Sequence, residues 1–145
     1  MTSTSETAQE AANRTLIADS FAAWQARSGS PFDILAEHAR WTIPGHSVVA
    51  GSYTPKAVFI EKVITPFNAR MNVPLAVTNV RRIFAEGDTV IAFFDGAGEA
   101  RDGVRYENTY VWIMRLENGQ IVEVTAFFDS IAFDALWNRV TTAHT

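Results

Sequence analysis

Hydrophobic residues near the start of the chain are spaced as on one face of a helix. Leu16 and Ile17 are followed by Phe21 and Trp24 at intervals of four and three residues. This spacing predicts a helix from about residue 7 to residue 27 that turns one stripe toward the core. Residues 1–8, which are mostly small and polar, are expected to form a flexible tail.

Shorter elements are predicted between this helix and Arg70. An apolar run within residues 32–35 predicts a second helix of two or three turns, and residues 40–43 predict a brief strand. Thr54-Pro55 has the pattern of an N-cap followed by proline at the first helical position. A third helix is therefore expected from there to about Arg70.

From Pro74 onward the hydrophobic period changes to two. Segments rich in Val, Ile, Phe, Tyr and Thr alternate with turn residues, which predicts antiparallel strands at residues 75–85, 89–97, 104–116 and 120–128. Asn118-Gly119 is a strong hairpin signal, because a type I′ turn needs two residues that tolerate positive φ. A last helix is expected at residues 131–140, capped by Asp129 or Ser130.

This order of elements predicts an α+β fold with a single domain over residues 1–145. A chain of 145 residues buries about two-thirds of its extended surface on folding, enough for one core. Hydrophobic residues make up 48% and the net charge is −4, with no basic run longer than Arg81-Arg82, so we expect no nucleic-acid partner. Neither a membrane-spanning stretch nor a signal-peptide pattern is seen, so we expect no membrane partner and a cytoplasmic location.

The strand predicted at residues 104–116 is the first candidate wall of a site. Charged residues crowd its odd positions near the ends, so we assign the even face inward. That face carries Tyr106, Asn108, Tyr110, Trp112 and Met114. A buried amide left unpaired costs about 1–3 kcal/mol, so Asn108 implies either a local partner or a ligand.

Asp95 is the main candidate for acid–base chemistry. It ends the apolar run at residues 90–94, where loss of water would raise the pKa of a carboxyl toward the range useful for proton transfer. The alternative is that Asp95-Gly96 simply begins a turn. Asp129 is a second candidate, although its strand position points it away from the buried face and suits a helix cap. Which of the two acids would act as base stays open.

Several other chemistries are excluded. The chain has no cysteine, which removes disulfides and thiolate catalysis. Its histidines lack metal-ligand spacing, and no glycine-rich phosphate motif or nucleophile elbow is present, so we expect no metal and no cofactor. His46, in the loop after the strand at residues 40–43, is either a proton shuttle or an ordinary solvated loop residue.

Three segments resemble SnoaL-like proteins: residues 41–53, 108–113 and 118–129. These proteins belong to the nuclear transport factor 2-like superfamily, with ketosteroid isomerase, scytalone dehydratase and limonene epoxide hydrolase. The resemblance implies a cone-shaped barrel in which a curved, mainly antiparallel sheet wraps around N-terminal helices and an apolar pocket, usually in a homodimer. It also implies cofactor-free acid–base chemistry on small hydrophobic molecules.

The resemblance does not carry the family's catalytic acids over. In limonene epoxide hydrolase an acid takes the position of Ala126, and an arginine and a second acid lie near Phe93 and Asp95. Only Asp95 is present in this chain, so epoxide hydrolysis is disfavoured. The aspartate of polyketide cyclases also falls near Ala126, which weakens the case for cyclase activity.

The leading hypothesis is a cofactor-free enzyme of the isomerase, cyclase or dehydratase type. Asp95 would move the proton, Asn108 and Tyr110 would hydrogen-bond the developing oxyanion, and His46 or Tyr53 would assist at the mouth. The alternative is a non-catalytic binding protein with the same pocket. Its expected lining residues are Trp41, Tyr53, Tyr110, Trp112 and Phe128.

A homodimer is expected through the odd face of the sheet. That face is apolar enough at its centre to bury against a second copy. Its residues are Thr109, Val111, Ile113, Thr125 and Phe127. Whether the predicted loop at residues 98–103 covers the pocket stays open.

Overall fold

The computed structural model describes residues 5–142. The first half holds α1 (Ala8–Gln25), a 3₁₀ turn η1 (Pro31–Ile34), β1 (Leu35–Ile43), β2 (Gly51–Tyr53) and a helical segment made of α2 (Lys56–Phe59), the π-helical η2 (Ile60–Ile64) and α3 (Thr65–Asn68). The second half holds β3 (Met71–Glu86), β4 (Thr89–Ala100), β5 (Arg105–Glu117), β6 (Gln120–Phe128) and α4 (Ser130–Arg139). No helix within residues 5–142 is both long and apolar enough to cross a membrane.

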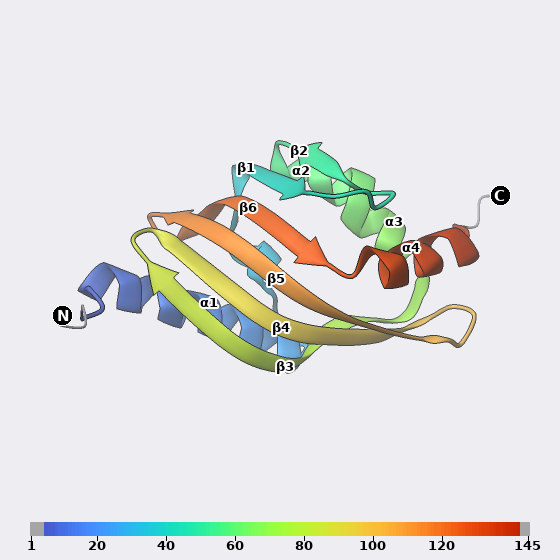
Figure 1. Ribbon diagram of the computed structural model, residues 1–145, viewed down its shortest axis with the longest axis horizontal. Coiled ribbons are helices and arrows are strands. Elements are labelled where there is room, and N and C mark those ends of the chain that lie inside the picture. Colours follow the sequence, from blue (N-terminus) through green and yellow to red (C-terminus); the bar gives the residue numbers. More distant parts are fainter. Residues whose placement is uncertain (1–4, 143–145) are drawn as a thin grey trace.

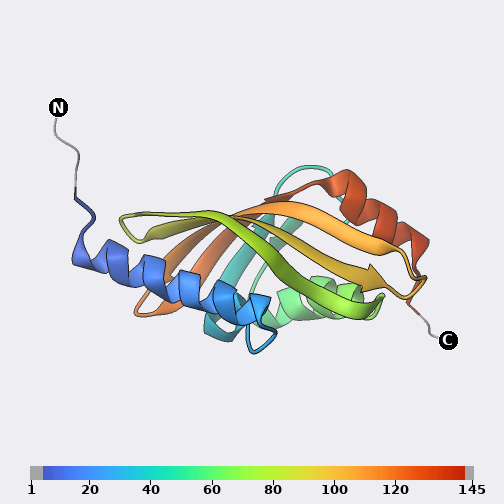
Figure 2. The ribbon, with the colours of Figure 1, turned by 90° about the horizontal axis from the view of Figure 1, so that it is seen from below.

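All six strands form one curved, open sheet in the order β2-β1-β6-β5-β4-β3. Neighbouring strands are antiparallel except β1 and β6, which run parallel and bring the N-terminal and C-terminal halves together. Figure 1 shows the twist of the sheet, and Figure 2 shows α1 lying along its concave side. The segment of α2, η2 and α3 packs near β1, and α4 follows the end of β6. The predicted α+β class with a curved, mainly antiparallel sheet around helices is confirmed, and the sheet is not closed into a barrel.

The core lies between α1 and the concave face of the sheet. On α1 the predicted stripe is buried, with Ile17 and Phe21 0% exposed and Trp24 8% exposed. On β5 every even position from residue 106 to residue 116 is buried, and the odd positions are exposed or half-buried. The predicted inward face of this strand is therefore confirmed.

Two of the predicted local signals are also confirmed, and the start of α1 has a cap that was not predicted. Thr7 caps α1 through a capping box with Glu10, and the side chain of Asp129 accepts hydrogen bonds from the first turn of α4. Asn118 and Gly119 both have positive φ, 51° and 77°, as the predicted hairpin turn requires.

The region around residues 30–55 differs from the prediction. The expected second helix is only the single turn η1, and β1 begins at Leu35 rather than at residue 40. A register shift between Leu35 and Arg40 breaks the alternation of side chains, which concealed the start of this strand. Thr54 is not a helix cap: Pro55 takes the N-cap position and no side chain caps that helix.

The long strands β3 and β4 extend beyond their predicted ends. β3 begins at Met71 and β4 continues to Ala100, so the loop expected at residues 98–103 shortens to a turn at residues 101–104. Gly98 permits this extension, because a Cβ there would lie 2.6 Å from the carbonyl oxygen of Val73 on the neighbouring strand. The short β2 strand was not predicted.

Candidate functional site

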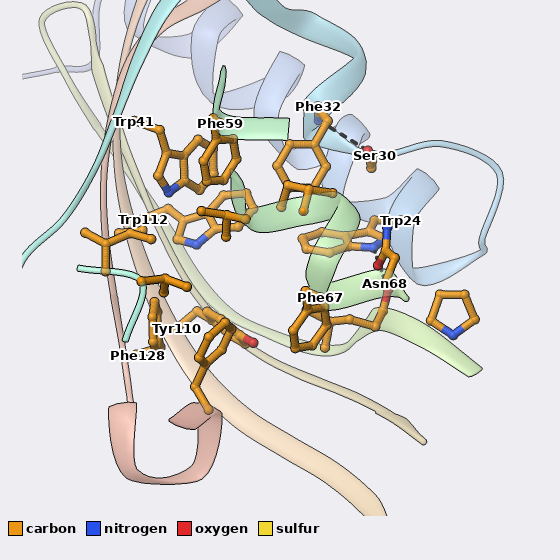
Figure 3. A pocket seen from close by; sticks show the side chains of 18 of the residues that line it. Trp24, Ser30, Phe32, Trp41, Phe59, Phe67, Asn68, Tyr110, Trp112 and Phe128 are labelled. Carbon is orange, nitrogen blue, oxygen red and sulfur yellow. Dashed lines mark hydrogen bonds between the residues drawn. The ribbon is translucent and has the colours of Figure 1, made fainter. Parts of the chain in front are cut away.

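A cavity of about 450 Å³ lies between the concave face of the sheet and the helices. Its wall combines residues of α1, η1, β1, the helical segment 56–68, β5, β6 and α4, and it is mainly aromatic and aliphatic (Figure 3). The buried lining residues are Trp24, Trp41, Ile43, Val49, Phe59, Val63, Phe67, Tyr110, Trp112, Ala126 and Phe133. Phe128, Phe32, Ile64 and Leu75 are half-buried members of the same wall.

The aromatic rings of the wall hold one another in place. Trp41 stacks on Phe59 with ring centroids 4.2 Å apart and planes 12° apart, and Trp112 stands at 85° to Trp41 at 4.9 Å. Figure 3 shows this group on one side of the open space and Trp24 and Phe67 across from it. Ala126 pairs with Trp112 across the strands, so its small side chain leaves room beside the indole.

Polar lining residues gather at the rim. Arg27, Asp33 and Asn68 are exposed, and Ser30 is half-buried. Arg27 donates to the carbonyl oxygen of Pro74 at 3.1 Å, and Asp33 accepts from the backbone N–H of Ser30 at 3.0 Å. Charged side chains of the lining are thus confined to the mouth of the cavity.

Tyr110 is the polar side chain of the inner wall that belongs to a hydrogen-bond network. Its hydroxyl lies 2.8 Å from the hydroxyl of Tyr106, which in turn accepts from the Asn108 amide nitrogen at 2.8 Å. The amide of Asn108 is fixed in orientation, because its oxygen accepts from the backbone N–H groups of Thr109 and Asp129 while its nitrogen also donates to the Asp129 carbonyl.

The fixed amide occupies one lone pair of the Tyr106 oxygen, and either hydroxyl can be the donor in the contact between Tyr106 and Tyr110. Tyr106 is 4% exposed and packs against Phe67 and Phe133. Among residues 5–142, the hydroxyl oxygen of Tyr110 can accept the hydroxyl proton of Tyr106. If Tyr106 donates to Tyr110, the proton of Tyr110 is left for a molecule in the cavity that this residue lines. Burial raises the pKa of Tyr106 to about 12 and raises the pKa of Tyr110 well above its usual value. Tyr110 therefore stays protonated and acts as a hydrogen-bond donor rather than a base.

Asp95 does not belong to this cavity, and the expectation of a raised pKa is wrong. Its carboxylate accepts from Arg81 at 2.9 Å and from the Thr109 hydroxyl at 2.7 Å, on the outer face of the sheet. These hydrogen bonds, with that of Arg81 the largest cause, hold the pKa of Asp95 below its usual range. Asp95 and Asp129 line instead a separate polar hollow of about 580 Å³.

The other predicted site residues divide into two groups. Trp41, Tyr110, Trp112 and Phe128 all line the cavity. Asn108 has local partners for its amide and borders the outer hollow, so the structure favours the first of its two predicted explanations. His46 is exposed in the loop after β1 and is not part of the lining. Tyr53 lies behind the wall, where it packs against Phe59 and donates to the carbonyl oxygen of Val49.

Several lining residues were not predicted as part of the site. Trp24 had been identified only as a helix residue facing the core, and Phe59 and Phe67 lay only within the expected third helix. The sequence does not separate a core stripe from a cavity wall. Ala126 had been noted only for the acid that it lacks. Within residues 5–142 no group of histidine, cysteine or carboxylate side chains could hold a metal ion.

Comparison with known proteins identifies the family. Residues 17–124 match the family model of the SnoaL-like domain, and no curated protein matches the chain. Among solved structures, a protein of unknown function with a cystatin-like fold from Xanthomonas campestris is 27% identical, with a TM-score of 0.70 over 86% of this chain and 98% of that chain.

More distant structures share the fold. An NTF2-like protein from Burkholderia thailandensis is 22% identical, with a TM-score of 0.66 over 86% of this chain and 95% of that chain. TerC, co-crystallised with polyporic acid, is 18% identical, with a TM-score of 0.67 over 87% of this chain and 98% of that chain. The chain therefore belongs to the SnoaL-like domain family.

Proposed function

We propose that the chain binds a neutral, largely aromatic small molecule in the cavity, with the Tyr110 hydroxyl as a polar contact at its buried end. The observation that carries the proposal is an apolar cavity of about 450 Å³ with the phenol of Tyr110 on its inner wall. Ligand pockets have volumes of about 300–1,000 Å³ and combine apolar walls with a few polar groups. The ligand is expected to be neutral because, among residues 5–142, the inner wall has no charged side chain to offset the loss of hydration of an ion.

TerC supports a small-molecule ligand, since a structure with this fold was co-crystallised with polyporic acid. The small side chain of Ala126 supports it as well, because the space beside Trp112 is open to a flat molecule. This function does not require chemical modification of the ligand. Binding without catalysis agrees with the inner wall, which has no carboxylate side chain within the described residues.

A second candidate function is acid–base catalysis of the isomerase, cyclase or dehydratase type. The geometry of Tyr110 favours it, because a protonated phenol in a site shielded from water can stabilise an oxyanion that develops on a bound carbonyl. Asp95 has no part in this version, since it lies on the outer face. Asp33 at the rim is the carboxylate of the lining and therefore the candidate base.

Binding of 9-fluorenone, followed by quenching of tryptophan fluorescence, tests the proposal. We expect saturable binding at one site, and Tyr110→Phe should weaken it about fivefold to tenfold, the worth of a typical hydrogen bond. Tyr53→Phe is the matched control, because it removes a phenol hydroxyl behind the wall. Absence of saturable binding by fluorenone and its apolar parent fluorene would contradict the proposal. Incubation with enolisable aromatic ketones then separates the two functions, since only an enzyme yields product.

We also propose that two copies associate through the outer face of the sheet. Phe127 is 46% exposed there, and Val111, Ile113 and Thr125 are half-buried beside it. Such an apolar strip is suited to an isologous contact between identical subunits. Sedimentation at micromolar concentration should give a dimer, and Phe127→Glu should give a monomer that keeps its fold. A wild-type monomer would refute the association.

A further inference from the structure

We propose that the indole N–H groups of Trp41 and Trp112 bind the ligand together with Tyr110, so that the inner wall selects molecules whose buried end carries only hydrogen-bond acceptors. This inference rests on the proposed binding function and specifies its ligand class. The class is a flat ketone or quinone that enters with its carbonyl oxygen first.

The two indole nitrogens have no partner of their own. Trp41 and Trp112 are each only 4% exposed, and neither N–H reaches an acceptor within residues 5–142. Yet no side-chain nitrogen or oxygen that is sealed from water lacks a partner in this part of the chain. Both indole nitrogens must therefore touch accessible space, and the space that both side chains line is the cavity.

Trp24 supplies the contrast. It lines the same cavity and is similarly buried, but its N–H donates to the carbonyl oxygen of Leu75 at 3.0 Å. The fold thus pairs one of three cavity indoles with its own backbone and leaves two unpaired. An indole nitrogen is a donor only, so the two unpaired N–H groups at the cavity surface are free to donate to an acceptor on a ligand.

The donors are held in fixed positions. Trp41 is stacked on Phe59, and the edge of Trp112 meets Trp41 and Phe94, with ring centroids 4.9 Å and 5.1 Å apart. Trp112 and Tyr110 are two positions apart on the same face of β5, and in Figure 3 both border the same open space. A rigid set of donors loses little conformational entropy when a ligand binds.

No side chain of the inner wall other than Tyr110 has an oxygen that could accept a hydrogen bond, within the residues described. Ser30, Asp33 and Asn68, which do have acceptor oxygens, lie at the rim. A carbonyl oxygen at the buried end can accept from the indole and phenol donors, whereas the proton of a hydroxyl there would have poor partners. The wall therefore distinguishes a ketone from the alcohol of the same shape.

Three ligands of nearly equal shape test the inference: 9-fluorenone, 9-fluorenol and fluorene. We expect the wild-type protein to bind fluorenone about tenfold more tightly than fluorene and fluorenol, the value of one to two hydrogen bonds. Trp112→Phe and Trp41→Phe keep an aromatic ring and remove one donor each. Each should reduce the preference for fluorenone over fluorene about threefold or more. Trp24→Phe, the matched control, should leave that preference unchanged.

An NMR measurement on the unsubstituted chain avoids any question of folding. The sequence has four tryptophans, so four indole N–H signals are expected. Fluorenone should shift the signals of Trp41 and Trp112 downfield more than fluorene does, and the Trp24 signal should show no such difference. Equal shifts with both ligands, or a fluorenone preference that survives both Phe variants, would overturn the inference. Failure of fluorene and fluorenone to bind at all would instead refute the proposed function.

Discussion

Replacement of Asn108 by alanine is expected to destabilise the protein strongly, although Asn108 touches no ligand. The side chain is 7% exposed and joins β5 to the start of α4 through hydrogen bonds to Thr109, Asp129 and the Tyr106 hydroxyl. Alanine removes the partner of two backbone N–H groups, one carbonyl and one phenol. If half of these groups stay out of reach of water, at about 1–3 kcal/mol each, the free energy of unfolding falls by about 2–6 kcal/mol.

Urea denaturation measures this loss. With an m-value of about 2 kcal/mol/M, the midpoint for Asn108→Ala should fall by about 1–3 M, and the m-value should stay constant. Asn79→Ala is the control: this amide is exposed and makes one long contact of 3.5 Å, so its removal should change stability by less than about 0.5 kcal/mol.

The same variant tests the direction of the hydroxyl chain. Without the Asn108 donor, both lone pairs of the Tyr106 oxygen are open to Tyr110, so donation from Tyr110 to Tyr106 competes more strongly with donation into the cavity. The affinity for fluorenone should therefore be lower in Asn108→Ala than in the wild type. It is measured without urea, at a temperature where both proteins are folded. A urea midpoint for Asn108→Ala equal to that of Asn79→Ala would refute the reasoning, because the hydrogen bonds of the Asn108 amide would then contribute nothing to stability.

Three further predictions concern charge and space. The pKa of Asp95 is lowered in the folded state, so its contribution to stability is complete above the unfolded pKa of about 3.9 and is lost as the pH falls through the folded value. Asp95→Asn should therefore lower the free energy of unfolding at pH 7 by less than about 1 kcal/mol and leave fluorenone binding unchanged. In thermal melts, the difference in melting temperature between this variant and the wild type should become smaller below pH ~4. Ala126→Asp places a carboxyl in the apolar cavity, where burial raises its pKa, so this variant should be less stable at pH 8 than at pH 5 relative to wild type; a pH-independent difference would show that the carboxyl escapes to water. Gly98→Ala puts a Cβ 2.6 Å from a backbone oxygen and should lower the melting temperature more than Gly96→Ala, whose nearest contact is the flexible end of Leu75 at 3.0 Å; equal melting temperatures would contradict this.

The sequence predicted the sheet well because its signals are local. Alternation along β5 placed five side chains inward, and Asn118-Gly119 marked the hairpin between β5 and β6. Residues 32–35 were misassigned because Ser30 and Asp33 close a single turn on themselves, after which a register shift hides the alternation of β1. Apolar content alone cannot separate a short helix from such a strand.

The candidate site was predicted in part. Strand parity correctly placed Tyr110 and Trp112, because an antiparallel neighbour fixes which face they occupy. The same parity argument, applied to β4, would have placed Asp95 on the face opposite to the buried Phe94. The sequence could not predict that the indole N–H groups of Trp41 and Trp112 are unpaired. This depends on which tryptophan lies next to a backbone carbonyl in the folded chain, as Trp24 does.

The parallel contact between β1 and β6 has a consequence for synthesis of the protein on the ribosome. Trp41 is in register with Val124, so residues more than eighty positions apart must meet before that wall of the cavity exists. Contacts of such sequence separation form late and slowly. A nascent chain that ends before β6 holds α1 and the first strands but no binding site, and its apolar residues are left for chaperones to shield until the last strand emerges.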